Sequence, residues 1–339
     1  MIDCGMIAEL LTYAEWARER LMLPISELAD EQLDQPFEMG TGSVRATLRH
    51  IYFAEWIWAE RLGVPGCQAL PRAESLNAAA ELAGNARALT DAYRSWLRAL
   101  PSEALQRPVT YVDLAGKRWT NLIGDALLHV CNHGVHHRTQ ALNMMRHLGR
   151  PVPAPGIDYI FMRLEPGPEP PALTIPALRR FYAYGDWATG RVLRAAEELT
   201  SEQLDQPFDI GAGTLRATLR HIRDAEQWWF ENWTRGPSHT FPTAADRPAL
   251  DKIRVEFEET AQRRNEFLAG LSGAEELRRP VTGRPRPNVS RTFPLGVTML
   301  QLCLHGTHHR AQAINMLRRL GRAIPGVDYI GFARETGQT

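Results

Sequence analysis

Histidine is the residue type whose number and spacing in this chain point to chemistry. Of the 11 histidines among 339 residues, eight occupy matching positions in two similar segments. Neutral imidazole is the commonest side-chain ligand for transition metals in proteins, so these eight residues predict metal sites. The matching pairs are His50/His221, His133/His305, His136/His308 and His137/His309, whereas His129, His147 and His239 have no histidine counterpart.

The spacing of the clustered histidines suggests how an ion would be held. His133 and His137 are four residues apart, and His133 and His136 are three apart. Both spacings place two imidazoles on one face of a helix, so spacing alone leaves either pair open. His50 would supply a third ligand from a facing helix, as in metal sites built inside helix bundles. Three imidazoles leave a coordination position open, which is typical of catalytic sites.

These histidines belong to a sequence unit that occurs twice. Residues 31–50 and 202–221 agree at 15 of 20 positions, with an offset of 171. Residues 133–150 and 305–322 agree at 13 of 18 positions, with an offset of 172. A period this long indicates a duplicated domain rather than a solenoid.

The two copies are joined by a proline-rich segment. Residues 165–176 contain five prolines, which favour an extended, semi-rigid linker. We therefore expect one domain over residues 1–165, a linker over 166–175 and a second domain over 176–339.

Each copy must place its histidines on helices. Apolar residues recur every three or four positions from Ile7 to Leu21, which predicts a first helix. A second helix is expected from the cap residue Ser43, matched by Thr214, to about Arg61. Further helices are expected over about 75–99 and 121–148. Four amphipathic helices per copy predict an all-α protein made of two tandem four-helix bundles.

The connection before each last helix differs between the copies. Residues 110–120 predict a short β-hairpin or extended loop around Gly116. The counterpart, residues 282–293, contains two prolines, so we expect it to be less strand-like.

The ordered set of motifs resembles the DinB/YfiT superfamily of metal-binding four-helix proteins. The resemblance rests on Leu48-Arg49-His50, on the N-H-x-x-H-H-R-x-Q pattern from Asn132 to Gln140, and on an opening Tyr13-x-x-Trp16-Ala17. It covers nearly the whole chain, once per copy. The positions that precede Gln140 and Gln312 depart from the glycine common in the family, being Thr139 and Ala311.

The resemblance implies a metal triad in each copy and a divalent ion as cofactor. Zinc or nickel is favoured, and iron, manganese and copper are compatible with imidazole. Because relatives are often homodimers, the resemblance also implies a monomer whose two copies form an intramolecular pseudo-dimer. By analogy the ligands fall on His50, His133 and His137 in the first copy, and on His221, His305 and His309 in the second.

Other residues near the triads have more ordinary interpretations. Glu55 and Glu226 follow the first histidine of each triad by five residues and are expected to form salt bridges or to support the ligands. Arg138 and Arg310 are expected to form ion pairs between helices, with binding of an anionic substrate as the alternative. Small core residues are expected at Cys131 and Cys303, and packing residues at Trp56, Trp58, Trp228 and Trp229.

Composition excludes several classes of function. The 39 basic residues balance 39 acidic ones, so the chain lacks the electrostatic footprint of a nucleic-acid binder or of a protein drawn to an anionic membrane. No apolar run is long enough to span a bilayer, and the N-terminus does not resemble a signal peptide. The four scattered cysteines predict reduced thiols and a cytoplasmic location.

The leading functional hypothesis is a divalent-metal-dependent enzyme that acts on a small molecule. Relatives implied by the resemblance transfer low-molecular-weight thiols such as mycothiol or bacillithiol, and one group isomerises maleylpyruvate with such a thiol. A transferase that uses a thiol and a hydrolase both fit a three-histidine site with an open position. The alternative is a non-catalytic, stress-associated protein that binds a metal or a small ligand.

Overall fold

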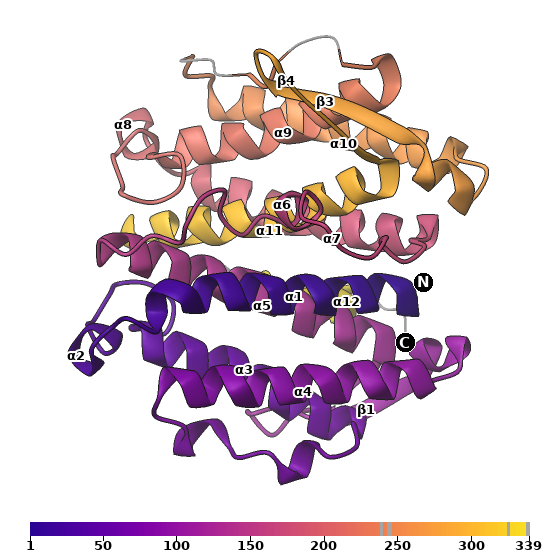
Figure 1. Ribbon diagram of the computed structural model, residues 1–339. Coiled ribbons are helices and arrows are strands. Elements are labelled where there is room, and N and C mark those ends of the chain that lie inside the picture. The colour runs from indigo at the N-terminus through magenta and orange to yellow at the C-terminus, as the bar shows by residue number, and fades with distance from the viewer. Residues whose placement is uncertain (238–239, 243–245, 324–325, 337–339) are drawn as a thin grey trace. The chain divides into compact units, whose positions relative to one another are not determined.

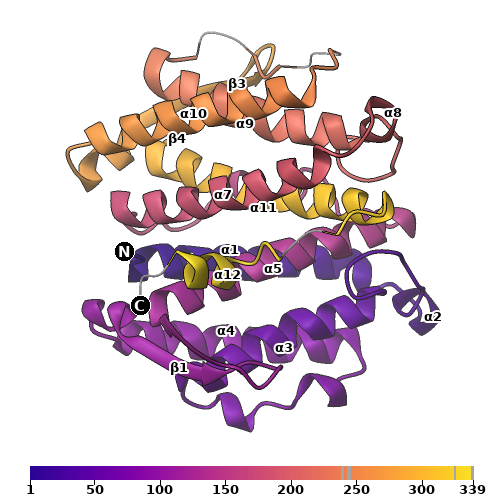
Figure 2. The same ribbon diagram turned by 180° about the vertical axis from the view of Figure 1, so that it is seen from behind.

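A computed structural model of the chain describes residues 1–237, 240–242, 246–323 and 326–336. The chain divides into two compact units, residues 1–162 with the C-terminal segment from Asp328, and residues 163–327. Figures 1 and 2 show the helices of each unit from opposite sides. His239 lies outside the described residues.

The first unit is built on a bundle of four long helices and two short ones. Their bounds are α1 (Cys4–Ile25), α2 (Asp30–Leu33), α3 (Val44–Leu62), α4 (Ala79–Ala99), α5 (Ile123–His147) and α6 (Tyr159–Met162). Helix α1 packs against α4 and α5, and α3 packs against the same two helices, so the four form a square bundle. Figure 1 shows these helices lengthwise. The apolar faces of all four meet at its centre.

The second unit repeats this arrangement. Its helices are α7 (Ile175–Ala196), α8 (Ser201–Leu204), α9 (Leu215–Arg235), α10 (Leu250–Gly270) and α11 (Leu295–Arg319). Helix α7 packs against α10 and α11, and α9 packs against the same two helices (Figure 2). The prediction of two tandem four-helix bundles is therefore confirmed.

The start of the second long helix of each unit is fixed by a side-chain cap. The hydroxyl of Ser43 accepts a hydrogen bond from the backbone N–H of Ala46 at 3.1 Å, and Thr214 does the same for Ala217 at 3.1 Å. These caps satisfy backbone donors that have no partner within the helix. Both predicted caps are confirmed, and His50 consequently lies at the end of the second turn of α3.

Two helices begin later than the hydrophobic pattern predicts. Helix α4 begins at Ala79 because residues 73–75 form a separate 3₁₀ turn. Helix α5 begins at Ile123 because the preceding residues pair in a β-hairpin, β1 (Pro108–Val112) with β2 (Arg118–Leu122). The predicted hairpin around Gly116 is confirmed.

The second unit also has a hairpin, so the expectation of a less strand-like connection was wrong. Strands β3 (Pro280–Arg286) and β4 (Val289–Pro294) pair antiparallel, with an irregular register between Gly283 and Arg286. Pro285 falls inside that irregular stretch, where no ladder hydrogen bond is required of it. Asn288 adopts a positive φ of 63° in the turn, a conformation that asparagine tolerates.

The C-terminal helix α12 (Tyr329–Glu335) packs on α5 of the first unit. The buried Tyr329 hydroxyl donates to Asp125 Oδ1 at 2.6 Å, and Arg334 Nη2 donates to the Tyr111 hydroxyl at 2.7 Å. Asp125 is matched by Val297 in the second repeat, so this acceptor exists only in the first. Helix α12 therefore belongs to the second repeat by sequence but to the first compact unit by its contacts.

The boundaries 1–165 and 176–339 stay a prediction, as does the pseudo-dimer. No helix among the described residues is long and apolar enough to cross a membrane.

Candidate metal centres

The structure brings three predicted ligands of the first repeat together. His50 lies on α3, and His133 and His137 lie one turn apart on the facing α5. One ring nitrogen from each lies within 4.8 Å of the other two, and the Nε2 atoms of His50 and His133 are 3.2 Å apart.

The second repeat builds the same cluster from α9 and α11. The Nε2 atoms of His221 and His305 are 3.1 Å apart, and the ring of His309 lies 4.3 Å from that of His305 between centroids. One nitrogen of each lies within 4.8 Å of the other two. The same geometry thus arises twice from sequences that differ in their loops.

Hydrogen bonds distinguish the two histidine pairs that spacing left open. Gln140 Oε1 lies 2.7 Å from Nδ1 of His137, while Gln140 Nε2 lies 3.0 Å from Nε2 of His136. The amide therefore accepts from His137 and donates to His136, which fixes the proton of neutral His137 on Nδ1. With its proton on Nδ1, His137 presents Nε2 as the nitrogen that could coordinate an ion, whereas Nε2 of His136 accepts from Gln140.

The same arrangement occurs in the second repeat. Gln312 Oε1 lies 2.7 Å from His309 Nδ1, and Gln312 Nε2 lies 3.1 Å from His308 Nε2. The i,i+4 pair is thus the one whose ring nitrogens face the third histidine in both units.

A glycine in the turn before α3 lies directly against the orienting glutamine. Gly40 has a φ of 55°, and a Cβ at this position would lie 2.5 Å from Gln140 Oε1. Gly211 has a φ of 57°, and a Cβ there would lie 2.6 Å from Gln312 Oε1. The motif predicted from the sequence includes both glutamines but assigns them no role, and neither glycine is singled out there, although each glutamine and each glycine is matched in the other repeat.

Burial keeps the imidazoles in the form that binds metal. It lowers the pKa of His50, and together with neighbouring imidazoles it holds the pKa of His133 well below the ordinary value. Burial and neighbouring imidazoles likewise hold the pKa of His305 and His309 well below that value. A neutral imidazole is the species that coordinates a metal, so these nitrogens are ready ligands near neutral pH.

The donor set fits a divalent transition metal. Each neutral imidazole carries a single N–H, and that of His137 is used on Gln140. The Nε2 atoms of His50 and His133 approach each other to 3.2 Å, and the ring of His137 lies 4.3 Å from that of His133 between centroids. Three converging nitrogens without a carboxylate suit zinc, nickel, copper or iron better than magnesium or calcium.

The surroundings of the two clusters differ. In the first unit the ring of His129 lies 5.5 Å from His133 and 5.5 Å from Trp58. Gln301 replaces His129 in the second unit, where the ring of Phe241 lies 5.5 Å from His221. The first cluster therefore has a fourth imidazole beside it, and the second has a phenylalanine ring.

The glutamates near the triads form the salt bridges expected of them. Glu55 pairs with Arg18 of α1 at 3.3 Å, and Glu226 pairs with Arg264 of α10 at 2.7 Å. The arginine comes from a different helix in each unit, because Thr189 stands at the position of Arg18 and Tyr93 at that of Arg264.

The expected ion pairs of Arg138 and Arg310 are absent from the described part of the chain, and that expectation was wrong. Arg310 donates to the hydroxyls of Thr189 and Thr307 at 3.4 and 3.0 Å. Arg138 lies over the ring of Tyr13, 5.7 Å from its centroid. The α1 carboxylates Glu15 and Glu19 pair with Arg94 and Arg87 of α4 instead.

The cysteines and tryptophans are packing residues, as predicted. Cys131 and Cys303 are buried, and burial raises the pKa of the Cys131 thiol to about 12. A thiol in that state is neither a ligand nor a nucleophile near neutral pH. The four tryptophans near the triads are buried as well, namely Trp56, Trp58, Trp228 and Trp229.

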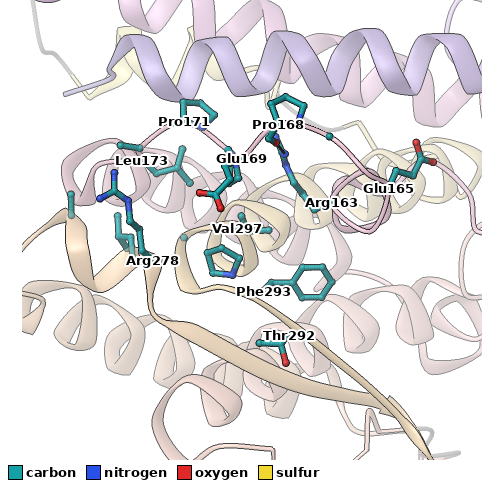
Figure 3. Close-up of a pocket in the computed structure, with 17 residues that line it drawn as sticks. Arg163, Glu165, Pro168, Glu169, Pro171, Leu173, Arg278, Thr292, Phe293 and Val297 are labelled. Atoms are coloured by element: carbon teal, nitrogen blue, oxygen red, sulfur yellow. Dashed lines mark hydrogen bonds between the residues drawn. The ribbon is translucent and has the colours of Figure 1, made fainter.

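A large groove of the second unit lies away from the histidines. It has a volume of about 350 Å³ and lies between the linker and the segment from β4 into α11. Figure 3 shows Glu169 of the linker facing it, with Arg278 and Phe293 on the opposite wall. No histidine lines this groove, so the triads rather than the groove define the candidate site.

Gln140→Leu is expected to weaken metal binding by the first triad about 10–100-fold, because His137 loses the acceptor that fixes its ring. Gln140→Glu keeps an oxygen acceptor and should retain most of the affinity. Competition with a chromogenic chelator measures both, in a chain whose second triad is removed by His305→Ala. Equal affinities of the Leu variant and its parent would contradict the orienting role.

Acid is expected to destabilise the metal-free protein below about pH 6.5. The folded-state pKa values of His133, His305 and His309 lie below the unfolded value of 6.5, so the unfolded chain binds more protons in this range. Each group then removes up to about 1.4 kcal/mol of stability per pH unit as the pH falls. Urea unfolding at pH 7.5 and pH 5.5 measures the difference.

His129 supplies a control for that result. Burial lowers its pKa to about 4, and Gln301 shows that the fold accepts glutamine here. The variant His129→Gln should therefore reduce the acid sensitivity of the first unit. A stability independent of pH between 7.5 and 5.5 would refute the neutral state of these imidazoles.

Comparison with known proteins places both repeats in one family. The family model described as "DinB family" matches twice, over residues 1–167 and 174–339. Protein DinB of Bacillus subtilis (strain 168) is 27% identical over 161 residues, which cover 45% of this chain and 93% of that protein. No solved structure matches the chain. Two matches that together span nearly the whole sequence show that the chain belongs to the DinB family, as a tandem of two family domains.

Proposed function

We propose that the chain is a divalent-metal-dependent enzyme that acts on a small molecule, with one three-histidine centre in each repeat. The observation that carries the proposal is the convergence of three imidazole nitrogens within 4.8 Å, built twice. A divalent ion held there would supply a Lewis acid toward a thiol or a water at the open position.

The chain's own residues define what the substrate must bring. Cys131 and Cys303 are buried with raised pKa values, so they do not serve as nucleophiles. A thiol that reacts at these centres is therefore one that the substrate supplies, which favours a transferase that uses a low-molecular-weight thiol. Hydrolysis needs only water and is the second reaction that the donor set supports.

The chain supports this role by orienting ligands rather than by adding acids or bases. Gln140 and Gln312 fix one ligand ring in each centre through bonds of 2.7 Å. We propose neither nucleic acid nor membrane as a partner, in line with a net charge of zero. The four cysteines are unpaired, which supports a reducing compartment such as the cytoplasm.

Turnover by the metal-loaded protein tests the proposal. Protein loaded with zinc or nickel is offered a panel of low-molecular-weight thiols with electrophilic acceptors, and a panel of esters and amides. We expect product formation that the double variant His133→Ala, His305→Ala lacks. Equal turnover by that variant, or none with any loaded metal, would overturn the enzymatic role.

A binding role without catalysis is the second candidate, and one observation favours it. In each unit the triad joins two helices, α3 to α5 and α9 to α11, so an ion there would cross-link the bundle. This role predicts that chelation lowers the melting temperature while no substrate is turned over.

A further inference from the structure

Two arginines from distant parts of the sequence lie close together near the first centre. Arg61 lies at the end of α3, and Arg334 lies on α12, which packs along α5 (Figure 2). Burial lowers the pKa of Arg61, and the charge of Arg334 adds to this shift, so the two cations are near neighbours. Neither arginine forms an ion pair with any residue that the structure describes. Like charges held together without a paired carboxylate are typical of sites that bind anions.

Aromatic rings hold the two guanidinium groups in place. The guanidinium carbon of Arg61 lies 5.0 Å from the ring centroid of Trp58 and 4.9 Å from that of Tyr111. The guanidinium carbon of Arg334 lies 4.0 Å from the ring centroid of Trp119, and its Nη2 donates to the Tyr111 hydroxyl at 2.7 Å. A ring stacked on a guanidinium fixes its orientation without using the N–H groups in its plane.

Several of those N–H groups remain available to a ligand. Arg61 uses Nη2 on the backbone carbonyl of Val112 at 2.9 Å. Its Nε and Nη1, and Nη1 of Arg334, have no hydrogen-bond partner in the described part of the chain and are not cut off from solvent. Nε of Arg334 is enclosed and is therefore not counted among them.

The carboxylates of this region are used in other ways. Asp113 accepts from Trp119 Nε1 at 2.7 Å and from two backbone N–H groups of its own turn. Burial lowers the pKa of His50, and the carboxylate of Asp328 opposes that shift. Asp328 precedes α12, so the beginning of this helix lies near the triad and its last turn carries Arg334 to the hairpin.

One tryptophan and one histidine connect the arginines to the metal ligands. The ring of Trp58 lies 5.5 Å from that of His129, which lies 5.5 Å from that of the ligand His133. Burial lowers the pKa of His129, and the charges of Arg334 and Arg61 lower it further. A small molecule whose reacting atom binds the ion could therefore reach the arginines with a group several bonds away.

The second centre has neither arginine. Asn232 stands at the position of Arg61, and Leu164 stands at that of Arg334. Whatever these two arginines bind is therefore specific to the first centre.

Aromatic side chains take the corresponding place in the second unit. Gly283 stands at the position of Tyr111, and a Cβ there would lie 2.7 Å from Trp228 Cη2. The ring of Trp228 lies 5.6 Å from that of Phe241, which lies 5.5 Å from that of His221. The two centres thus offer different neighbours to a substrate.

We infer that Arg61 and Arg334 bind a carboxylate group of the substrate at the first centre, and that the second centre has no such preference. The inference rests on the proposed function, because it needs a small molecule that reacts at the ion. A guanidinium presents paired N–H groups that match the two oxygens of a carboxylate. Asp113 lies close enough to Arg61 to raise its pKa, which favours a carboxylate over a doubly charged phosphate.

Binding of thiol probes to the cobalt-loaded protein tests this inference without turnover. Mercapto carboxylates of increasing chain length are compared with the amides of the same length, in a chain whose second centre is removed by His305→Ala. The absorption of a cobalt–thiolate bond reports binding at the ion. We expect the best carboxylate to bind about 10–100-fold more tightly than its amide, as expected for hydrogen bonds between charged groups.

Variants taken from the second repeat identify the arginines responsible. Arg61→Asn and Arg334→Leu should each remove most of the preference for the carboxylate and leave the affinity for the amide unchanged. Arg118→Asn is the matched control, because it removes an exposed arginine of the same hairpin and should keep the preference. In a chain whose first centre is removed by His133→Ala, carboxylates and amides should bind equally.

The outcomes separate this inference from the proposed function. Equal binding of carboxylates and amides to the first centre at every chain length would overturn the inference and leave the proposed function intact. Failure of every thiol to bind cobalt at either centre would overturn the proposed thiol chemistry and the inference with it. The comparison of carboxylates with amides decides even if a variant unfolds, because it needs no substitution at either arginine.

Discussion

His133→Ala is expected to reduce the metal content of the chain from two ions to one. His133 is the central ligand of the first triad, because its Nε2 lies 3.2 Å from that of His50 and its ring lies 4.3 Å from that of His137. Removing a direct ligand should weaken binding by more than the roughly 100-fold that the loss of an orienting partner costs. The second triad should remain filled.

The same measurement is made on the wild type, on His133→Ala, on His305→Ala and on the double variant. His305→Ala should also leave one ion, and the double variant should leave none. Elemental analysis by mass spectrometry after purification without chelators gives the number of ions per chain. A double variant with the metal content of the wild type would refute the assignment of these residues as ligands.

His136, which lies on α5 between the two proposed ligands, supplies the control for the metal-content measurement. His136 Nε2 is bound to Gln140 Nε2 at 3.0 Å, so His136→Ala should leave two ions per chain. Loss of an ion from His136→Ala but not from His137→Ala would mean that His133 and His136, rather than His133 and His137, are the helix α5 ligands.

The helices and the candidate histidines follow from local sequence because both depend on short-range patterns. The apolar period locates α1, the caps Ser43 and Thr214 locate α3 and α9, and both matched histidine spacings put two rings on one helix face. Spacing could not choose between His136 and His137, since three and four residues are both neighbours on a helix. The hydrogen bonds of Gln140 favour His137 as the ligand, because the amide oxygen accepts from His137 Nδ1 while the amide nitrogen donates to His136 Nε2.

Features that depend on which helices face each other could not be predicted. Glu55 and Glu226 were expected to form salt bridges, but their partners come from α1 in one unit and α10 in the other. Arg138 forms no ion pair among the described residues, and it lies over the ring of Tyr13 instead. The β3–β4 hairpin was misjudged because prolines argue against a strand only where the ladder needs their N–H.

The buried glutamate pairs with Arg18 of α1 in the first unit and with Arg264 of α10 in the second, and substitution of Arg264 is the second change with a large expected effect. Arg264→Tyr, which places the first repeat's residue in the second, should destabilise the second unit by about 3–5 kcal/mol. Arg264 is 1% exposed, binds Glu226 and Asp186, and lies 4.3 Å from the ring of Tyr182. Its removal leaves the buried carboxylate of Glu226 without its ion-pair partner.

A second substitution should restore part of this loss. Thr189→Arg places an arginine where Arg18 stands in the first unit, from which it can reach Glu226 as Arg18 reaches Glu55. The pair Arg264→Tyr, Thr189→Arg therefore reproduces the charge arrangement of the first repeat. We expect the double variant to be more stable than Arg264→Tyr alone.

The dependence on pH distinguishes lost charge pairing from lost packing. Burial raises the pKa of Glu226 and Arg264 counteracts it, so the carboxyl of the single variant takes up a proton more readily. A raised folded-state pKa means that the stability penalty grows as the pH rises above the unfolded value of 4.5. Hydrogen exchange of α7, α9 and α10 at pH 6 and pH 8 measures the penalty, with α1, α3 and α4 as the internal standard. A penalty that is the same at both pH values, or that Thr189→Arg leaves unchanged, would show that Arg264 acts by filling space and not by its charge.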